Sequence, residues 1–266
     1  MIFFPTPMPL GSSQAPSLKK IWRFGVGVVA LLAISQGLPG FAEELGGPQL
    51  PQIPRAGLSP PAAGRADFGI EPASPETHAI ADWVVDAGDN HALPFILIDK
   101  AAAKAYVFDN RGKIKGASLV LLGLAHGDDS VPGIGQRKLS TIRPEERTTP
   151  AGRFVASLDR NLHGEGILWI DYDAAISLHR VITGTPKEHR AARLASTSVD
   201  DKRITFGCIN VPVTFYDRIV GPSFKRSNGV VYVLPETRSA LAMFGAYDVE
   251  ERARARIANA GSVAAQ

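Results

Sequence analysis

The residue with the clearest chemical potential is the single cysteine of the chain, Cys208, which directly follows Gly207. A glycine there permits an unusual backbone and a close approach of a ligand, so the amides of Gly207 and Cys208 can point together at a developing oxyanion. A helix expected to start near Pro212 would favour the thiolate through its exposed N–H groups. A free cysteine also suits the role of a small buried hydrophobe, and both interpretations stay open at this point. One cysteine excludes a disulfide framework and a cluster of cysteine metal ligands.

A nucleophilic thiol needs a base within hydrogen-bond reach, and histidine is the usual one. All six histidines of the chain precede the cysteine: His78, His91, His126, His163, His179 and His189. This order is the reverse of that in papain-like and similar cell-wall cysteine peptidases. It leaves two exported classes in which histidine comes first, the sortases and the L,D-transpeptidases.

Three segments carry a resemblance to one of these classes. Thr-Phe-Gly-Cys-Ile-Asn at 205–210 resembles the Ser/Thr-x-Gly-Cys-x-Asn/Arg motif of the L,D-transpeptidase (YkuD-type) catalytic domain. Thr-Pro-Ala-Gly-Arg-Phe at 149–154 matches that family's Thr-Pro-x-Gly-x-Phe segment, and Ala-Ile-Ser-Leu-His-Arg at 175–180 resembles the strand that ends in its catalytic histidine. The segments occur in the family's order, and the resemblance covers residues 93–234. The sortase segment Thr-Leu-x-Thr-Cys is absent from the sequence.

The resemblance implies an exported peptidoglycan L,D-transpeptidase with Cys208 as nucleophile, His179 as base and the amides of Gly207 and Cys208 as oxyanion donors. Asn210 and Thr205 are expected to bind substrate, and no cofactor or metal is expected. The thiolate would attack the third residue of a stem peptide. The acyl group would then pass to a neighbouring stem, to a lysine of a wall-attached protein or to water. The alternatives are a non-catalytic wall-binding module on the same scaffold and an L,D-carboxypeptidase-type hydrolase.

The chain departs from the family pattern in two places. Phe206 stands where most members have histidine, and 28 residues separate His179 from Cys208, more than the usual interval. The extra residues, Lys187 to Lys202, are polar and are expected to form a loop or short helix over the cleft. This segment contains His189, which is a second candidate for the catalytic base. Strand alternation favours His179, which would share a face with the small residues Ala175 and Ser177 and leave room for a substrate, while Ile176, Leu178 and Ile182 would face the core. The charged neighbours of His189 are typical of solvated surface.

The predicted elements indicate a mainly β single domain with a few peripheral helices, and the resemblance implies that it is a β-sandwich-like L,D-transpeptidase catalytic domain over 76–236. A helix is predicted from Ser74 to Gly88, a short one from Pro212 to Val220, and a helical tail over 237–266 with a charged helix from Val249 to Ile257. The predicted strands are Phe95–Ile98, Ala105–Phe108, Ser118–Leu122, Arg153–Ser157, Ile167–Tyr172, Ala175–Ile182 and Val230–Leu234.

Charge and composition place the domain outside the cytoplasm. The chain has 29 basic and 26 acidic residues, and the excess lies in residues 1–42, which hold three basic residues and no acid. This segment, with the apolar run Phe24–Ile34, predicts a signal peptide or an uncleaved signal anchor, and hence the periplasm or cell envelope. Residues 43–75 hold seven Pro and five Gly and predict a disordered tether. The remainder carries no net charge, so no nucleic-acid partner is expected, and membrane contact would come only through an uncleaved leader.

Overall fold

The computed structural model describes residues 64–264. The predicted leader, 1–42, and residues 43–63 of the predicted tether lie outside the described residues. Within 64–264 no helix is both long enough and apolar enough to cross a membrane.

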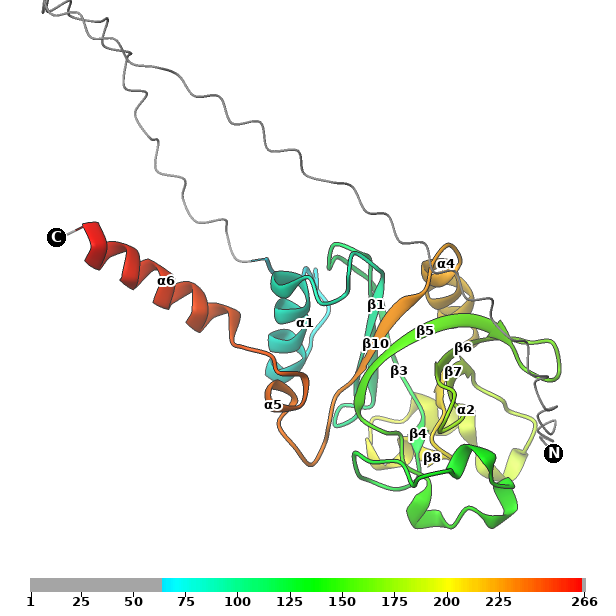
Figure 1. Cartoon of the computed structure of the whole chain (residues 1–266). Coiled ribbons are helices and arrows are strands. Elements are labelled where there is room, and N and C mark those ends of the chain that lie inside the picture. Colours follow the sequence, from blue (N-terminus) through cyan, green and yellow to red (C-terminus); the bar gives the residue numbers. More distant parts are fainter. Residues whose placement is uncertain (1–63, 265–266) are drawn as a thin grey trace, which may run out of the picture. The chain divides into compact units, whose positions relative to one another are not determined.

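A mixed eight-stranded sheet forms the centre of the domain, which confirms the prediction of a mainly β fold (Figure 1). Its strand order is β3-β2-β1-β10-β5-β6-β7-β9, with β1 parallel to β10, β7 parallel to β9 and the other neighbours antiparallel. A second, two-stranded sheet pairs β4 with β8 in parallel. The bounds are β1 Phe95–Asp99, β2 Lys104–Phe108, β3 Ile114–Leu119, β4 Leu122–Gly123, β5 Gly152–Arg160, β6 Gly166–Asp171, β7 Ile176–Arg180, β8 Arg203–Thr205, β9 Ile209–Val211 and β10 Gly229–Val233.

Strand β1 shows why the sequence of a central strand is an almost unbroken apolar run. Alternate side chains of a strand point to opposite faces. Phe95 and Leu97 pack into one cluster of buried residues, and Ile96 and Ile98 pack into another. Because both faces are covered, every residue of the strand is buried.

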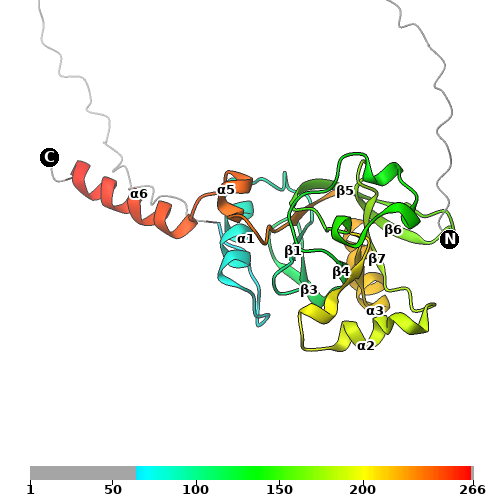
Figure 2. The same ribbon diagram turned by 90° about the horizontal axis from the view of Figure 1, so that it is seen from below.

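Helix α1 (Pro75–Ala87) covers the first face, as predicted. Ser74 caps it by accepting a hydrogen bond from the Thr77 amide at 3.2 Å, and Gly88 ends it in the left-handed region with φ 66°. Helix α5 (Ala240–Phe244) contacts α1, and both lie on the side of β1 and β10 that faces away from β7 (Figures 1 and 2). Phe68, within the segment predicted as tether, is 5% exposed in this same core, so packing begins ahead of Ser74.

The other side of the sheet holds the elements that carry the motifs. Beyond the end of β3, Leu121 exchanges backbone hydrogen bonds of 2.8 and 2.9 Å with Asn210 of β9. This bridge joins the two ends of the sheet and nearly closes it. Around it lie α2 (Arg190–Ala195), α3 (Val213–Phe215), a π-helical turn (Tyr216–Val220) and α4 (Gly221–Phe224).

Several boundaries differ from the predicted ones. The predicted strand Ser118–Leu122 is divided into the end of β3 and the start of β4. Strand β7 ends at Arg180, and Ile182, which was expected to face the core, is 51% exposed. The tail helix α6 (Val249–Ala264) is longer than predicted. Strands β8 and β9 were not predicted, since three residues are too few to show alternation.

Candidate active site

Cys208 and His179 are brought together by the pairing of two adjacent strands. Cys208 lies in the turn between β8 and β9, and His179 lies in β7, where it is paired with Asn210 in the parallel ladder. Burial lowers the pKa of His179, but its hydrogen bond to Cys208 and the charge of that group outweigh burial, and the pKa is raised. Burial raises the pKa of Cys208, but the hydrogen bond and charge of His179 reverse this effect, and the pKa is lowered. The two groups thus form a thiol–imidazole pair that favours the ionised thiol.

The ring of His179 has a defined orientation. Its Nδ1 lies 2.8 Å from the carbonyl oxygen of Arg180. Because a carbonyl only accepts, Nδ1 carries a proton and donates it. Nε2 is therefore left for Cys208 and for the side-chain amide of Asn210, whose Nδ2 is 3.1 Å away. An imidazole held in this tautomer can accept the thiol proton at Nε2.

Ser177, two residues before His179 on the same face of β7, completes the surroundings of the sulfur. Its Oγ lies 3.7 Å from Cys208 Sγ, and both its hydroxyl and its backbone amide lower the pKa of the thiol. On the other side, Sγ is 3.6 Å from the carbonyl of Ala175. Sequence analysis treated Ser177 as a small residue that leaves room for substrate. Because Ser177 and His179 are two residues apart in one strand, the sequence indicates that both face Cys208, and this spacing could have predicted the contact of Ser177 with the sulfur.

Two hydrogen bonds of the Thr205 side chain stabilise the turn that carries Cys208. The Thr205 hydroxyl donates to the carbonyl of Cys208 at 2.7 Å and accepts from the amide of Gly207 at 3.1 Å. Thr205 is buried, so it holds the turn from within and does not face a substrate. The Gly207 amide, expected to point at an oxyanion, is engaged inside the turn.

Gly207 is required by both conformation and space. Its φ of +127° is a value that side-chain-bearing residues rarely adopt, and a Cβ would lie 2.7 Å from the carbonyl oxygen of Thr148. The structure therefore explains the glycine of the Gly-Cys pair. The helix expected to activate the thiol does not do so, because β9 carries the chain away for three residues, about 10 Å, before α3 begins.

The Thr-Pro-x-Gly segment supports the same turn from the opposite side. The Thr149 hydroxyl donates to the carbonyl of Gly207 at 2.8 Å and accepts from the amide of Gly123 at 2.8 Å. The ammonium of Lys100, fully buried, donates to the Thr149 carbonyl at 3.1 Å and to Asp128 at 2.9 Å. The motif's threonine thus positions the Gly-Cys turn and makes no contact with the dyad.

Phe206, the departure from the family motif, has a specific neighbour. The guanidinium of Arg147 lies over its ring at 4.0 Å from the centroid. The same guanidinium donates to the carbonyl of Ile142 at 3.1 Å. A cation–π contact therefore occupies the place where most family members carry histidine.

Asn210 and Arg190, a residue of the inserted segment, lie next to the Cys208–His179 pair, which forms the candidate catalytic dyad. Asn210 is 1% exposed, and its Oδ1 accepts a hydrogen bond of 2.7 Å from Arg190, the first residue of α2. His189, the rival base, caps this helix with an exposed side chain, and its contacts do not include Cys208. The structure thus brings His179 to Cys208, leaves His189 at the surface and adds Arg190, which sequence analysis missed.

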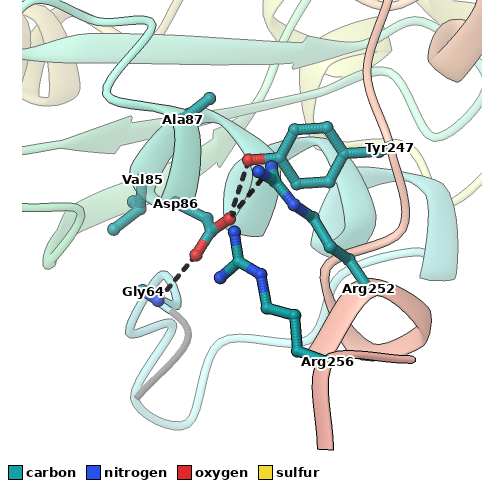
Figure 3. Close-up of a pocket in the computed structure, with 7 residues that line it drawn as sticks. All are labelled: Gly64, Val85, Asp86, Ala87, Tyr247, Arg252 and Arg256. Carbon is teal, nitrogen blue, oxygen red and sulfur yellow. Dashed lines mark hydrogen bonds and ion pairs between the residues drawn. The ribbon is translucent and has the colours of Figure 1, made fainter. Parts of the chain in front are cut away.

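Two other regions were considered for chemistry. His126 is exposed and lies 3.1 Å from Glu236, and within 64–264 no group of three or more His, Cys, Asp or Glu side chains could hold a metal ion. A pocket of about 570 Å³ lies between the end of α1 and the start of α6 (Figure 3). In it, Asp86 accepts hydrogen bonds from Gly64 at 3.1 Å and Tyr247 at 2.7 Å. None of the residues lining this pocket belongs to the Cys208 site.

Comparison with known proteins was made for the sequence and for the fold. No protein-family model and no curated protein matches the sequence. Among solved structures, the fold is similar to a mutant of the helical cell shape determining protein Pgp2 from Campylobacter jejuni, with 16% identity and a TM-score of 0.37 over 63% of this chain and 58% of that one. It is also similar to the catalytic domain of the L,D-transpeptidase from E. faecium, with 17% identity and a TM-score of 0.30 over 53% of this chain and 96% of that one. At these identities the likeness concerns the fold alone.

Proposed function

We propose that the protein is an exported cysteine acyltransferase of the L,D-transpeptidase type that acts on peptidoglycan stem peptides. The observation that carries this proposal is the placement of Cys208 beside His179 by the pairing of β7 with β9, where each group shifts the pKa of the other, on a glycine turn that the Thr149 motif supports. The pair supplies a nucleophile and a base, and the motif sequence around it supplies the substrate class by resemblance.

The reaction proceeds by acyl transfer through a thioester. The thiol proton of Cys208 passes to Nε2 of His179 as the sulfur attacks the carbonyl of the third stem-peptide residue. The tetrahedral intermediate collapses with cleavage of the C–N bond, and His179 returns the proton to the amine of the departing D-alanine. An incoming amine from a second stem, from a lysine of a wall-attached protein, or a water molecule then attacks the thioester and releases the thiol.

The oxyanion is assigned to backbone donors of the turn. The amide of Cys208 is the first donor, because the amide of Gly207 is bound to the Thr205 hydroxyl. A single preorganised donor of this kind contributes about 3 kcal/mol to the stabilisation of the transition state.

In this proposal the two residues expected to bind substrate have supporting roles. Thr205 is a support of the turn, and Asn210 acts on the imidazole of His179. Both act on the dyad from buried positions and leave recognition of the stem peptide to other side chains. Export to the periplasm or cell envelope follows from the charged and apolar leader, residues 1–42.

The test is incubation with a disaccharide tetrapeptide, followed by intact-protein mass spectrometry and analysis of the released products. The wild type is expected to gain the mass of a disaccharide tripeptide acyl group and to release D-alanine, and Cys208→Ala is expected to do neither. The products also identify the acceptor, since hydrolysis yields a disaccharide tripeptide and transpeptidation yields a cross-link.

A non-catalytic wall-binding module is the second candidate, and Phe206 with its Arg147 partner in place of the family histidine is the observation that favours it. Alkylation of Cys208 with iodoacetamide near neutral pH separates the two. Rapid alkylation supports the acyltransferase, and an inert thiol together with binding to purified sacculi supports the module.

A further inference from the structure

The inserted segment between His179 and Cys208 reaches the dyad through one side chain. Arg190 donates from Nη1 to Oδ1 of Asn210 at 2.7 Å and from Nε to Oε2 of Glu188 at 2.6 Å. Asn210 in turn presents Nδ2 to Nε2 of His179 at 3.1 Å. The side chain of Arg190 is 14% exposed and Asn210 is 1% exposed, so this relay lies largely out of water.

We propose that Arg190 is a positioning residue, which fixes the Asn210 amide against His179 and thereby opposes, in part, the protonation of the imidazole that Cys208 favours. This inference rests on the proposed acyl transfer for its catalytic meaning. The contacts that link Arg190, Asn210 and His179 are present whether or not the protein transfers acyl groups.

A side-chain amide has one acceptor oxygen and one donor nitrogen, and Arg190, which only donates, occupies the oxygen. Nδ2 must therefore face His179, and an N–H group directed at Nε2 stabilises the ring when Nε2 is unprotonated. If His179 becomes imidazolium, two N–H groups face each other. Without Arg190, the amide is free to rotate and offer its oxygen to the imidazolium.

The charge of Arg190 acts in the same direction as the Asn210 amide, and the charge of Cys208 opposes it. The ring is faced by Cys208 from the β8–β9 turn and by Arg190 from α2, whose positive charge lowers the pKa of His179. Glu188 is paired with Arg190 and partly offsets that charge. The neighbouring Arg180 side chain turns away from the ring to Asp217, at 2.8 Å. Arg190 acts on the imidazole through its contact with Asn210, and the amide and hydroxyl of Ser177 act on the sulfur.

Opposing the imidazolium has opposite effects on alkylation of Cys208 and on protonation of the leaving amine. A disfavoured imidazolium lowers the resting fraction of thiolate, which slows reaction of Cys208 with a simple alkylating agent. The same imidazolium is a stronger acid, so it returns its proton more readily to the amine that leaves the tetrahedral intermediate. Amines are poor leaving groups when unprotonated, and this step therefore gains from Arg190.

The experiment compares Arg190→Met with Arg193→Met in the full chain. Arg193 lies one turn further along α2, and within residues 64–264 its guanidinium donates to the carbonyls of Glu188 and Asp201, at 3.1 and 3.2 Å. Three quantities are measured: the pH profile of iodoacetamide alkylation, the NMR titration of the His179 ring nitrogens, and the rate of acyl-enzyme formation from a disaccharide tetrapeptide.

For Arg190→Met we expect alkylation near neutral pH to rise by roughly threefold to tenfold, the ring of His179 to titrate at a higher pH, and acylation by the tetrapeptide to slow. Arg193→Met is expected to leave the first two at the wild-type values. A fall of alkylation and acylation together in Arg190→Met, with an unmoved ring titration, would mean that Arg190 only supports the fold and would overturn the proposal. An absent acyl-enzyme in the wild type, with the alkylation shift still present, would refute the proposed function and leave the role of Arg190 standing.

Discussion

The hydroxyl of Thr149 donates a hydrogen bond of 2.8 Å to the carbonyl oxygen of Gly207, across 58 residues of sequence. The same hydroxyl accepts from the amide of Gly123, so one side-chain oxygen satisfies a buried carbonyl and a buried amide. The turn that carries Cys208 is therefore fixed by a residue that has no contact with the sulfur.

Removal of this hydroxyl should loosen the turn. Thr149→Val keeps the shape of the side chain and leaves the Gly207 carbonyl and the Gly123 amide without a partner, which costs about 1–3 kcal/mol of unfolding free energy. Urea unfolding measures this loss, and we expect the acylation rate to fall with it. Thr149→Ser is the control, because it keeps the hydroxyl. Equal stability of Thr149→Val and the wild type would contradict the role of the hydroxyl.

The conformation of Gly207 gives a second prediction. Gly207→Ala places a Cβ 2.7 Å from the Thr148 carbonyl at a φ of +127°. The backbone strain alone costs about 1–3 kcal/mol, and relief of the clash must displace the turn. We expect a reduced thermal midpoint and a loss of thiol alkylation. Gly133→Ala is a matched control, because it also has a positive φ but nothing lies within 4 Å of its Cβ. It should destabilise the fold and leave alkylation unchanged.

A third prediction concerns the buried ion pair behind the Thr149 motif. Lys100 and Asp128 both have fully buried side chains, 2.9 Å apart. Lys100→Met leaves the buried Asp128 carboxylate without its closest cation and with Arg238 at 3.5 Å as the remaining partner, which costs up to about 3–5 kcal/mol. Arg254→Met removes one partner of an exposed ion pair with Glu250 and should cost less than about 0.5 kcal/mol. Similar losses in the two variants, measured by urea unfolding, would contradict the structural role of the buried pair.

The same pair predicts how stability depends on pH. Burial raises the pKa of Asp128, but hydrogen bonds from Lys100 and Thr237 and from two backbone amides outweigh burial and hold the pKa well below its ordinary value of 3.8. A carboxyl with a depressed folded pKa stabilises the fold above its unfolded pKa, and this contribution is lost as the pH falls below about 4. Lys100→Met should therefore lose less stability than the wild type between about pH 4 and pH 2, as followed by thermal unfolding.

The ionisation of Cys208 gives a further prediction. His179 lowers the pKa of the thiol against the opposing effect of burial. In His179→Gln burial acts without this partner, so the thiol pKa rises and alkylation near neutral pH falls by roughly tenfold or more. The pH at half-maximal iodoacetamide reactivity should move upward. An unchanged profile would mean that the imidazole does not interact with the sulfur.

The sequence predicted those features that depend on local pattern. The apolar run at β1, the cap of α1 at Ser74 and the side-chain alternation that places His179 and Ser177 on one face are all readable without coordinates. The contact between Arg190 and Asn210 was not, because it joins a surface-like helix to a three-residue strand across a loop. The sequence analysis placed residues 209–211 just before a helix and did not predict strand β9. The pairing of β9 with β7 accompanies closure of the sheet through Leu121, which is a contact between segments distant in sequence.

The most direct test of the account is the rate at which the Cys208 thioester forms from a disaccharide tetrapeptide, followed by intact-protein mass spectrometry in the wild type, His179→Gln and His189→Gln. Loss of a general base slows a reaction by roughly a hundredfold to ten-thousandfold. We expect a loss of that size in His179→Gln, a rate within about twofold of the wild type in His189→Gln, and no adduct in a Cys208→Ala control. An adduct that persists in Cys208→Ala, or a loss confined to His189→Gln, would contradict the assignment of Cys208 and His179 as the catalytic pair.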